Sequence, residues 1–174
     1  MKYVSFLKRI FFMLLAFLCL FCSCETKYLS CEELLVFSIE YGIEGYSDNG
    51  WMFLKSAEEG DAFFMSDKTK KTVYGERFFE ALNKLEDFAV YVSASTPYEI
   101  AVFKCYSRND TEDILRMCYE RADELKVAMR YGKWENASKE ILICCYKTYV
   151  VFLFTESQER NEGIAYNLEN MLCA

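Results

Sequence analysis

Four runs of β-branched and aromatic residues, arranged as two close pairs, constrain the fold of this 174-residue chain more than any other feature. The first pair spans residues 87–93 and 98–107, and the second pair lies within residues 140–156. A short polar segment separates the two runs of each pair, ASTP in the first pair and Lys147 with Thr148 in the second. Runs with such short connections are typical of antiparallel β-hairpins. We therefore predict four strands in two hairpins.

A helical pattern follows each hairpin. Residues 108–132 place apolar side chains at spacings of three and four, which draws one stripe along a helix. The stripe consists of Ile114, Cys118, Ala122, Leu125 and Met129. Asn109 or Asp110 is expected to cap this helix and Gly132 to end it, and residues 157–172 predict a last helix. The order strand, strand, helix, strand, strand, helix predicts a two-layer α+β fold with helices packed on an antiparallel sheet.

The first half of the chain predicts a mainly helical part. Residues 30–42 begin with a Ser-x-x-Glu pattern, the signature of a capping box, and end at a glycine, which favours a helix. Residues 76–85 predict a second helix. Between them, residues 46–75 mix turn signals with brief apolar pieces, and the segment 66–71 is expected to form a turn. Periodicity assigns no element to the rest of this stretch.

The N-terminal 23 residues have the three-part layout of a secretory signal. A basic start is followed by an unbroken apolar run over residues 10–21 and by the small-residue exit CSC. A bilayer requires about 20 apolar residues, so the run is short for a permanent span. The segment from Phe21 to Cys24 resembles the lipobox of bacterial lipoproteins. This resemblance implies that residues 1–23 are a signal peptide and that Cys24 carries a lipid, such as palmitate, at the new N-terminus.

Two alternatives to lipidation stay open: an uncleaved N-terminal transmembrane anchor and plain secretion. In the lipoprotein case, residues 24–29 form a short tether whose full extension is at most about 20 Å. Residues 30–174 are then expected to form a single α+β domain close to the outer face of the cell membrane. The N-terminal lipid makes the membrane itself the first expected partner.

The chain contains no histidine, which narrows its chemistry. Ser-His-Asp and Cys-His arrangements, histidine metal sites and the usual proton shuttle near neutral pH are thereby excluded. Lys2, Lys8 and Arg9 are the only charged residues among the first 24, so the remainder has a net charge of about −10. A body this acidic repels phosphate backbones, which argues against a nucleic-acid partner. Binding of a cation or a basic partner stays open.

Six cysteines follow Cys24, and none of them forms a C-x-x-C pair. Zinc sites are typically built from such pairs, so we expect no metal and no other cofactor. Four of the six lie inside apolar runs, which predicts buried free thiols, although disulfides are an alternative outside the cytoplasm. These four are Cys105, Cys118, Cys144 and Cys145.

Glu99 and Arg121 are the candidate site residues within the predicted domain. Glu99 begins a predicted strand, and Arg121 precedes Ala122 of the apolar stripe, so the two side chains are expected to meet at the edge of the sheet. The pair would serve either as a structural ion pair or as a ligand-binding pair in a cleft. No residue is singled out as catalytic, because acidic neighbours such as Glu112 and Asp113 belong to the first turn of a helix, where acids are expected.

The second half of the chain resembles the domain of unknown function 4358 family, small bacterial proteins with a signal segment and one globular domain. The resemblance covers about residues 85–170. Its most specific parts are Glu99–Lys104, Arg121 and Tyr149–Val151. It implies a lipoprotein-like organisation, and it implies no catalytic or binding residue, because no activity is established for the family.

Three functional hypotheses follow. The first is a non-enzymatic lipoprotein that binds a protein or a small ligand, and the second is a cell-envelope enzyme that uses carboxylates or tyrosine. The third is a structural accessory subunit. Two converging acids in a cleft would favour the enzyme, whereas an exposed apolar patch would favour a binding module.

Overall fold

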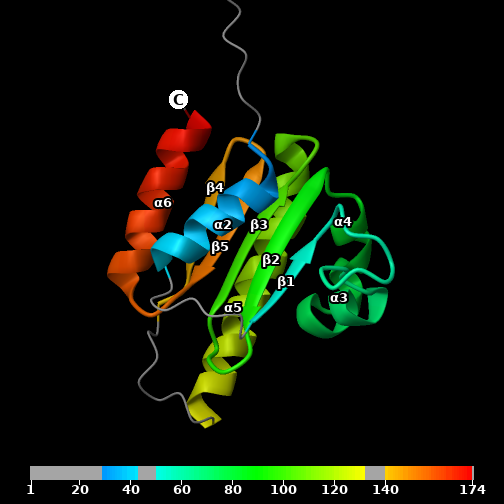
Figure 1. Ribbon diagram of the computed structural model, residues 1–174, viewed down its shortest axis with the longest axis horizontal. Coiled ribbons are helices and arrows are strands. Elements are labelled where there is room, and N and C mark those ends of the chain that lie inside the picture. Colours follow the sequence, from blue (N-terminus) through cyan, green and yellow to red (C-terminus); the bar gives the residue numbers. More distant parts are fainter. Residues whose placement is uncertain (1–28, 43–49, 132–139, 174) are drawn as a thin grey trace, which may run out of the picture.

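The computed structural model describes residues 29–42, 50–131 and 140–173 (Figure 1). Five strands form one antiparallel sheet in the order β1-β2-β3-β5-β4. The strands are β1 (Gly50–Leu54), β2 (Asp87–Ser93), β3 (Glu99–Lys104), β4 (Leu142–Tyr146) and β5 (Tyr149–Phe154). The two predicted hairpins are β2-β3 and β4-β5, and β3 joins them by pairing with β5.

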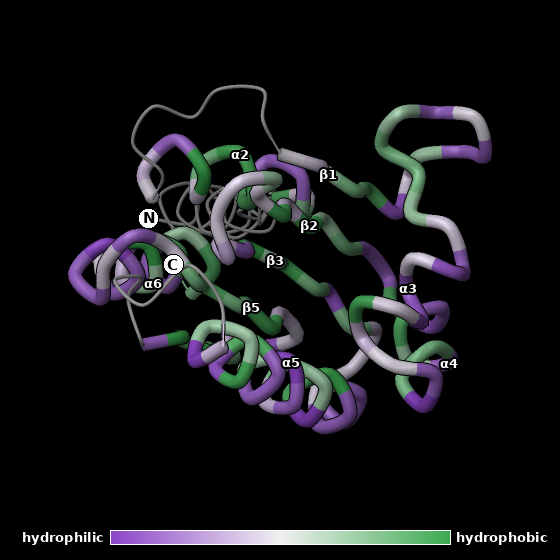
Figure 2. The backbone as a smooth tube through the Cα atoms, turned by 90° about the horizontal axis from the view of Figure 1, so that it is seen from below, coloured by the Kyte–Doolittle hydropathy of each residue, from purple (hydrophilic) through white to green (hydrophobic). Residues whose placement is uncertain are grey.

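Helices pack against both faces of this sheet. The helices are α2 (Cys31–Gly42), α3 (Asp67–Tyr74), α4 (Phe79–Asn83), α5 (Thr111–Tyr131) and α6 (Gln158–Cys173), with the short 3-10 helices η1 (Glu76–Phe78) and η2 (Arg108–Asp110). Figure 2 shows α2 and α6 on one side of the strands and α3, α4 and α5 on the other. The predicted α+β class with an antiparallel sheet is confirmed. The arrangement has three layers rather than two, because α2 and α6 cover the face opposite α5.

The central strands explain why helices are needed on both sides. All six residues of β5 are buried, as are the first five of β3. Ala101 and Phe103 belong to the core beneath α5, whereas Ile100 and Val102 belong to the core beneath α2 and α6. Burying a large apolar side chain contributes about 1.5–3 kcal/mol. A sheet with both faces apolar is therefore stable only when both are covered.

Capping residues set where the helices begin. At α2 the Ser30 hydroxyl accepts from the Glu33 amide (3.1 Å) while the Glu33 carboxylate accepts from the Ser30 amide (2.9 Å), which confirms the predicted capping box. The start before α5 differs from the prediction. Ser107 caps η2, and Asp110 closes a second capping box by accepting from the Ser107 amide. Asn109 and Asp110 are thus inside the first turn, because Ser107, two residues before Asn109, supplies the cap.

Two elements in residues 46–75 were not expected from the sequence pattern. β1 extends the sheet beside β2, with Trp51 opposite Val92. Residues 66–71, expected as a turn, instead form the N-cap and the first part of α3, with the Ser66 hydroxyl accepting from the Thr69 amide. Tyr74 is the one buried residue of α3. The helix is too short and too polar to show an apolar stripe in its sequence, and Tyr74 fixes it to the core.

Candidate functional site

A buried carboxylate lies beneath α5 at the start of the central strand. Glu99 is 1% exposed. Its Oε2 atom accepts hydrogen bonds from Arg121 Nε (2.9 Å) and Nη2 (2.8 Å), and its Oε1 atom accepts one from the Tyr74 hydroxyl (3.1 Å). The structure therefore brings Glu99 and Arg121 together. They meet at the start of the central strand β3, not at an edge strand.

The strand register directs Glu99 to this position. Glu99 lies opposite Phe154 of β5 and shares a face with Ala101, which belongs to the core beneath α5. Arg121 is one residue before the buried Ala122, so it stands beside the apolar stripe of α5 and reaches the carboxylate along its edge. A buried carboxylate requires such partners, since an isolated charge in this environment is strongly unfavourable.

Tyr74 is the member of this group that sequence reasoning missed. Burial and the nearby Glu99 charge raise the pKa of the Tyr74 hydroxyl well above its usual value of 10, so the hydroxyl remains protonated and donates. The only sequence signal was a tyrosine directly before Gly75, whose φ of 88° ends α3. Because residues 66–71 were expected to form a turn, the sequence pattern did not predict that the Tyr74 side chain would be buried in the core.

The Glu99 group joins three elements of the fold. Tyr74 comes from α3, Glu99 from β3 and Arg121 from α5. Both oxygens of the carboxylate accept hydrogen bonds. Burial and Glu99 also raise the pKa of the neighbouring Cys118 thiol, which keeps it protonated and unreactive. The geometry fits the structural ion pair of the two roles considered for Glu99 and Arg121.

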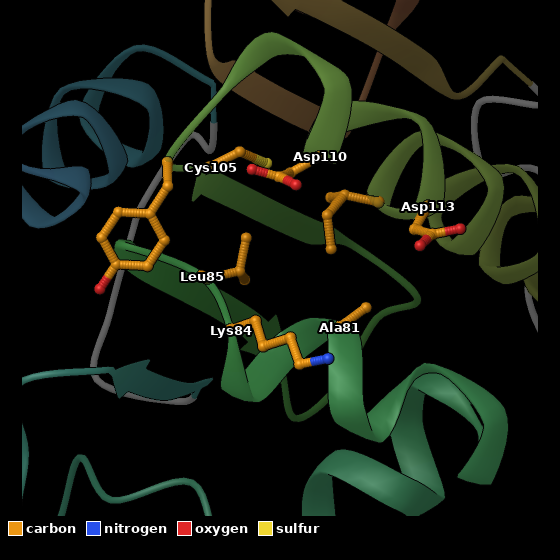
Figure 3. Close-up of a pocket in the computed structure, with 8 residues that line it drawn as sticks. Ala81, Lys84, Leu85, Cys105, Asp110 and Asp113 are labelled. Carbon is orange, nitrogen blue, oxygen red and sulfur yellow. The ribbon is translucent and has the colours of Figure 1, made fainter.

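An open cleft lies elsewhere, between the end of α4 and the beginning of α5 (Figure 3). Its volume is about 350 Å³. Ala81, Lys84 and Leu85 line one side, and the other side is formed by residues that follow β3 or begin α5. These are Cys105, Tyr106, Asp110, Asp113 and Ile114. Sequence reasoning singled out none of them as a site, because they come from three separate segments.

Charges of opposite sign face each other across the cleft. Figure 3 shows Lys84 on the α4 wall, and Asp110 and Asp113 on the facing wall. Asp110 Oδ2 accepts from the amide and hydroxyl of Ser107, and Asp113 Oδ1 accepts from Arg116 (2.6 Å). Within the described part of the chain, the other oxygen of each carboxylate has no donor and the Lys84 ammonium has no acidic partner. The cleft thus offers one cation and two acceptor atoms to a ligand.

The floor of the cleft contains the thiol of Cys105, whose pKa is raised. Cys105 is buried, and burial together with the Asp110 charge raises its pKa to about 11. At neutral pH the thiolate, the reactive form, is therefore a minor species. Cys105 acts here as a small apolar residue beside Leu85 and Ile114.

The other sequence predictions have mixed outcomes. The proposed lipid attachment residue Cys24 lies outside the described residues. Cys105 and Cys118 are buried free thiols as predicted, but Cys144 is half-buried and Cys145 is exposed. The expectation fails for Cys145 because β4 is an edge strand with a neighbouring strand on one side only. In residues 29–42, 50–131 and 140–173, no cluster of three or more cysteines and acids is placed to hold a metal ion.

No described helix combines the length and the apolar character required to cross a membrane.

Comparisons with known proteins give no match. No family model fits the chain, and no curated protein or solved structure is significantly similar to it. The resemblance to the domain of unknown function 4358 family accordingly stays a prediction from the residues that carry it.

Proposed function

We propose that this protein is a membrane-anchored extracytoplasmic lipoprotein whose domain binds a ligand in the cleft between α4 and α5 without catalysing a reaction. The observation that carries the proposal is the open cleft itself, with an apolar floor, the Lys84 ammonium on one wall and an open carboxylate oxygen of Asp110 and of Asp113 on the other. Sites with a few convergent polar groups over an apolar floor are typical of ligand binding. The anchor is supported by the lipobox-like segment that ends at Cys24.

The alternative of an envelope enzyme is favoured by one feature, the two carboxylates on the same wall of the cleft. Each of them already holds a structural contact through one oxygen, Asp110 in the capping box and Asp113 in its pair with Arg116. The thiol of Cys105 is protonated at neutral pH. Binding therefore accounts for the cleft with fewer assumptions than acid-base catalysis.

Fatty-acid labelling tests the anchor. The full chain is expressed in a bacterial host that is supplied with an alkyne-tagged palmitate. We expect the wild type and a Cys22→Ala control to be labelled and Cys24→Ala to be unlabelled, with processing of the wild type blocked by globomycin. Lipid label that persists in Cys24→Ala would remove the basis for the proposed anchor.

Site-specific photo-crosslinking in intact cells tests binding in the cleft. A photoreactive phenylalanine derivative at Tyr106, which lines the cleft and is 69% exposed, is expected to give adducts. Tyr131 at the far end of α5, 89% exposed, is the matched control. Equal adduct yields at the two positions would show that the cleft has no special affinity. Conversion of an added substrate that depends on Asp113 would favour the enzyme.

A further inference from the structure

The end of the sheet at which the described chain begins is fixed by two hydrogen bonds. The Cys31 amide donates to Asp87 Oδ2 (2.9 Å), and the Tyr149 hydroxyl donates to the Leu29 carbonyl (3.1 Å). Asp87 begins β2 and Tyr149 begins β5, and both lie opposite Lys104, the last residue of β3. The chain therefore enters the domain at the Lys104 end of the sheet.

The cleft lies at this same end. Cys105 and Tyr106 directly follow Lys104, while Lys84 and Leu85 shortly precede β2. The Glu86 amide donates to the Lys104 carbonyl (2.8 Å), which holds the two lining segments side by side. Figure 1 shows the beginning of α2, the β4-β5 turn and the beginning of α5 together at one end of the strands.

Chain length limits how far this end can stand from the proposed lipid. Five steps separate Cys24 from Leu29, and an extended chain spans at most about 3.6 Å per residue. Leu29 thus lies within about 18 Å of Cys24, the residue that would carry the lipid. The Lys104 end of the sheet, where the cleft also lies, is therefore the end at which a lipid on Cys24 would tether the domain.

The charges of the cleft select among the groups at a membrane surface. Lys84 complements a phosphate, and the open oxygens of Asp110 and Asp113 complement a primary ammonium, which can donate three hydrogen bonds. An ethanolamine headgroup carries both. A choline headgroup has no N–H donor, and a glycerol headgroup carries no cation for the two acids. A basic peptide would place positive charge against Lys84.

We infer that the cleft binds the phosphoethanolamine headgroup of a phospholipid in the membrane to which the protein is anchored. The inference rests on the proposed lipid anchor for its geometry. In this arrangement the headgroup is the ligand of the cleft. The Lys104 end of the sheet then faces the bilayer, and the β2-β3 turn at the opposite end faces away from it. Occupancy would then hold the domain in one orientation on the membrane.

Hydrogen exchange of the full, lipid-modified chain in nanodiscs tests the inference. One set of discs contains phosphatidylethanolamine with phosphatidylglycerol, and the other contains phosphatidylglycerol alone. We expect peptides from residues 81–85 and 105–114 to exchange several-fold more slowly in the first set, and peptides from residues 93–98 to exchange equally in both. Equal exchange of the cleft peptides in the two sets would overturn the inference.

A second arm uses glycerophosphoethanolamine, the water-soluble headgroup, added to the full chain in detergent. Lys84→Gln and Asp113→Asn are each expected to weaken its binding about tenfold, because each removes a charge-assisted contact. Lys126→Gln, an exposed lysine farther along α5, is the control and is expected to bind as the wild type does. Binding of a lysine tripeptide in the cleft, together with no binding of glycerophosphoethanolamine, would identify a basic peptide as the ligand and overturn the inference.

The intact mass of the purified protein separates this inference from the proposed anchor. A chain without lipid at Cys24 contradicts the anchor, and the detergent arm still decides whether the cleft binds the headgroup. A lipidated chain with no response to the headgroup contradicts the cleft assignment alone.

Discussion

The guanidinium of Arg121 donates two hydrogen bonds to one carboxylate oxygen of Glu99, from Nε at 2.9 Å and from Nη2 at 2.8 Å. The Glu99 side chain is 1% exposed and that of Arg121 is 18% exposed. Removing the cation would leave the carboxylate with the Tyr74 hydroxyl as its remaining donor among the described side chains. This pair therefore links the long helix α5 to the central strand of the sheet.

We expect Arg121→Ala to lower the free energy of unfolding by about 3 kcal/mol, because it leaves a buried charge uncompensated. Urea denaturation followed by circular dichroism measures the loss. Arg116→Ala is the matched control on the same helix, since Arg116 pairs with Asp113 on the exposed surface and should cost less than about 1 kcal/mol. Similar losses in the two variants, or an unchanged melting temperature for Arg121→Ala, would contradict this account.

Tyr74→Phe is expected to lower the free energy of unfolding by about 1–3 kcal/mol near neutral pH, because Glu99 loses a buried donor. The loss should depend on pH. Since the pKa of Tyr74 is raised in the folded state, the folded chain retains a proton that the unfolded chain releases above about pH 10. The stability contributed by Tyr74 is thus complete below that pH and declines above it.

The difference in unfolding free energy between wild type and Tyr74→Phe should therefore shrink when the pH is raised from about 8 to about 11. Guanidinium denaturation at the two pH values measures it. A difference that widens with pH would show that the hydroxyl is not held protonated by its surroundings.

Two helix glycines are expected to respond oppositely to alanine. A Cβ on Gly42 would lie 2.6 Å from Ile164 and 3.0 Å from Thr155, both buried, so Gly42→Ala should cost about 1–3 kcal/mol through overpacking. A Cβ on Gly163 would meet the ring of Tyr41 at 2.9 Å, but that ring is 49% exposed and can move. Gly163→Ala should therefore be neutral or stabilising by up to about 1 kcal/mol. Thermal unfolding of the two variants measures the change in stability. A larger loss of stability in Gly163→Ala than in Gly42→Ala would contradict this prediction.

Cysteine reactivity should follow burial rather than position in the chain. We expect iodoacetamide at about pH 8 to modify Cys145 and Cys173, which are exposed, and to leave Cys105 unmodified in the folded protein. Burial and Asp110 account for the slow reaction of Cys105 through its pKa of about 11. Peptide mapping by mass spectrometry gives the rates. Modification of Cys105 as fast as Cys145 would mean that the floor of the cleft is open to solvent and reagents.

The strongest sequence patterns predicted the sheet well. The two hairpins, α5 and α6 were read from long periodic or β-branched runs, whose pattern reflects burial in the folded chain. The contact between Glu99 and Arg121 was predicted from two positions: Glu99 begins a strand, and Arg121 lies beside the apolar stripe of the long helix. The element order alone did not show that the N-terminal helix covers the second face, because no local pattern records which side of a sheet a helix packs on.

The elements missed are those whose stability comes from contacts distant in sequence. β1 is held by pairing with β2, and α3 by the single buried ring of Tyr74. The cleft was also missed, since Lys84 and Asp113 come to line one cleft only when α4 and α5 are placed on the same face of the sheet. Local periodicity carries no information about contacts between residues that are distant in the sequence.

Asp110 has two tasks, closing the capping box with Ser107 and forming one wall of the cleft. Replacing it would change the ligand-facing charge and weaken the start of α5 together. Among the residues that the structure describes, Asp113, one turn farther along, holds only an exposed pair with Arg116. Evolutionary change of ligand preference in this fold is therefore expected at position 113, where selection on binding can act without opposing selection on folding.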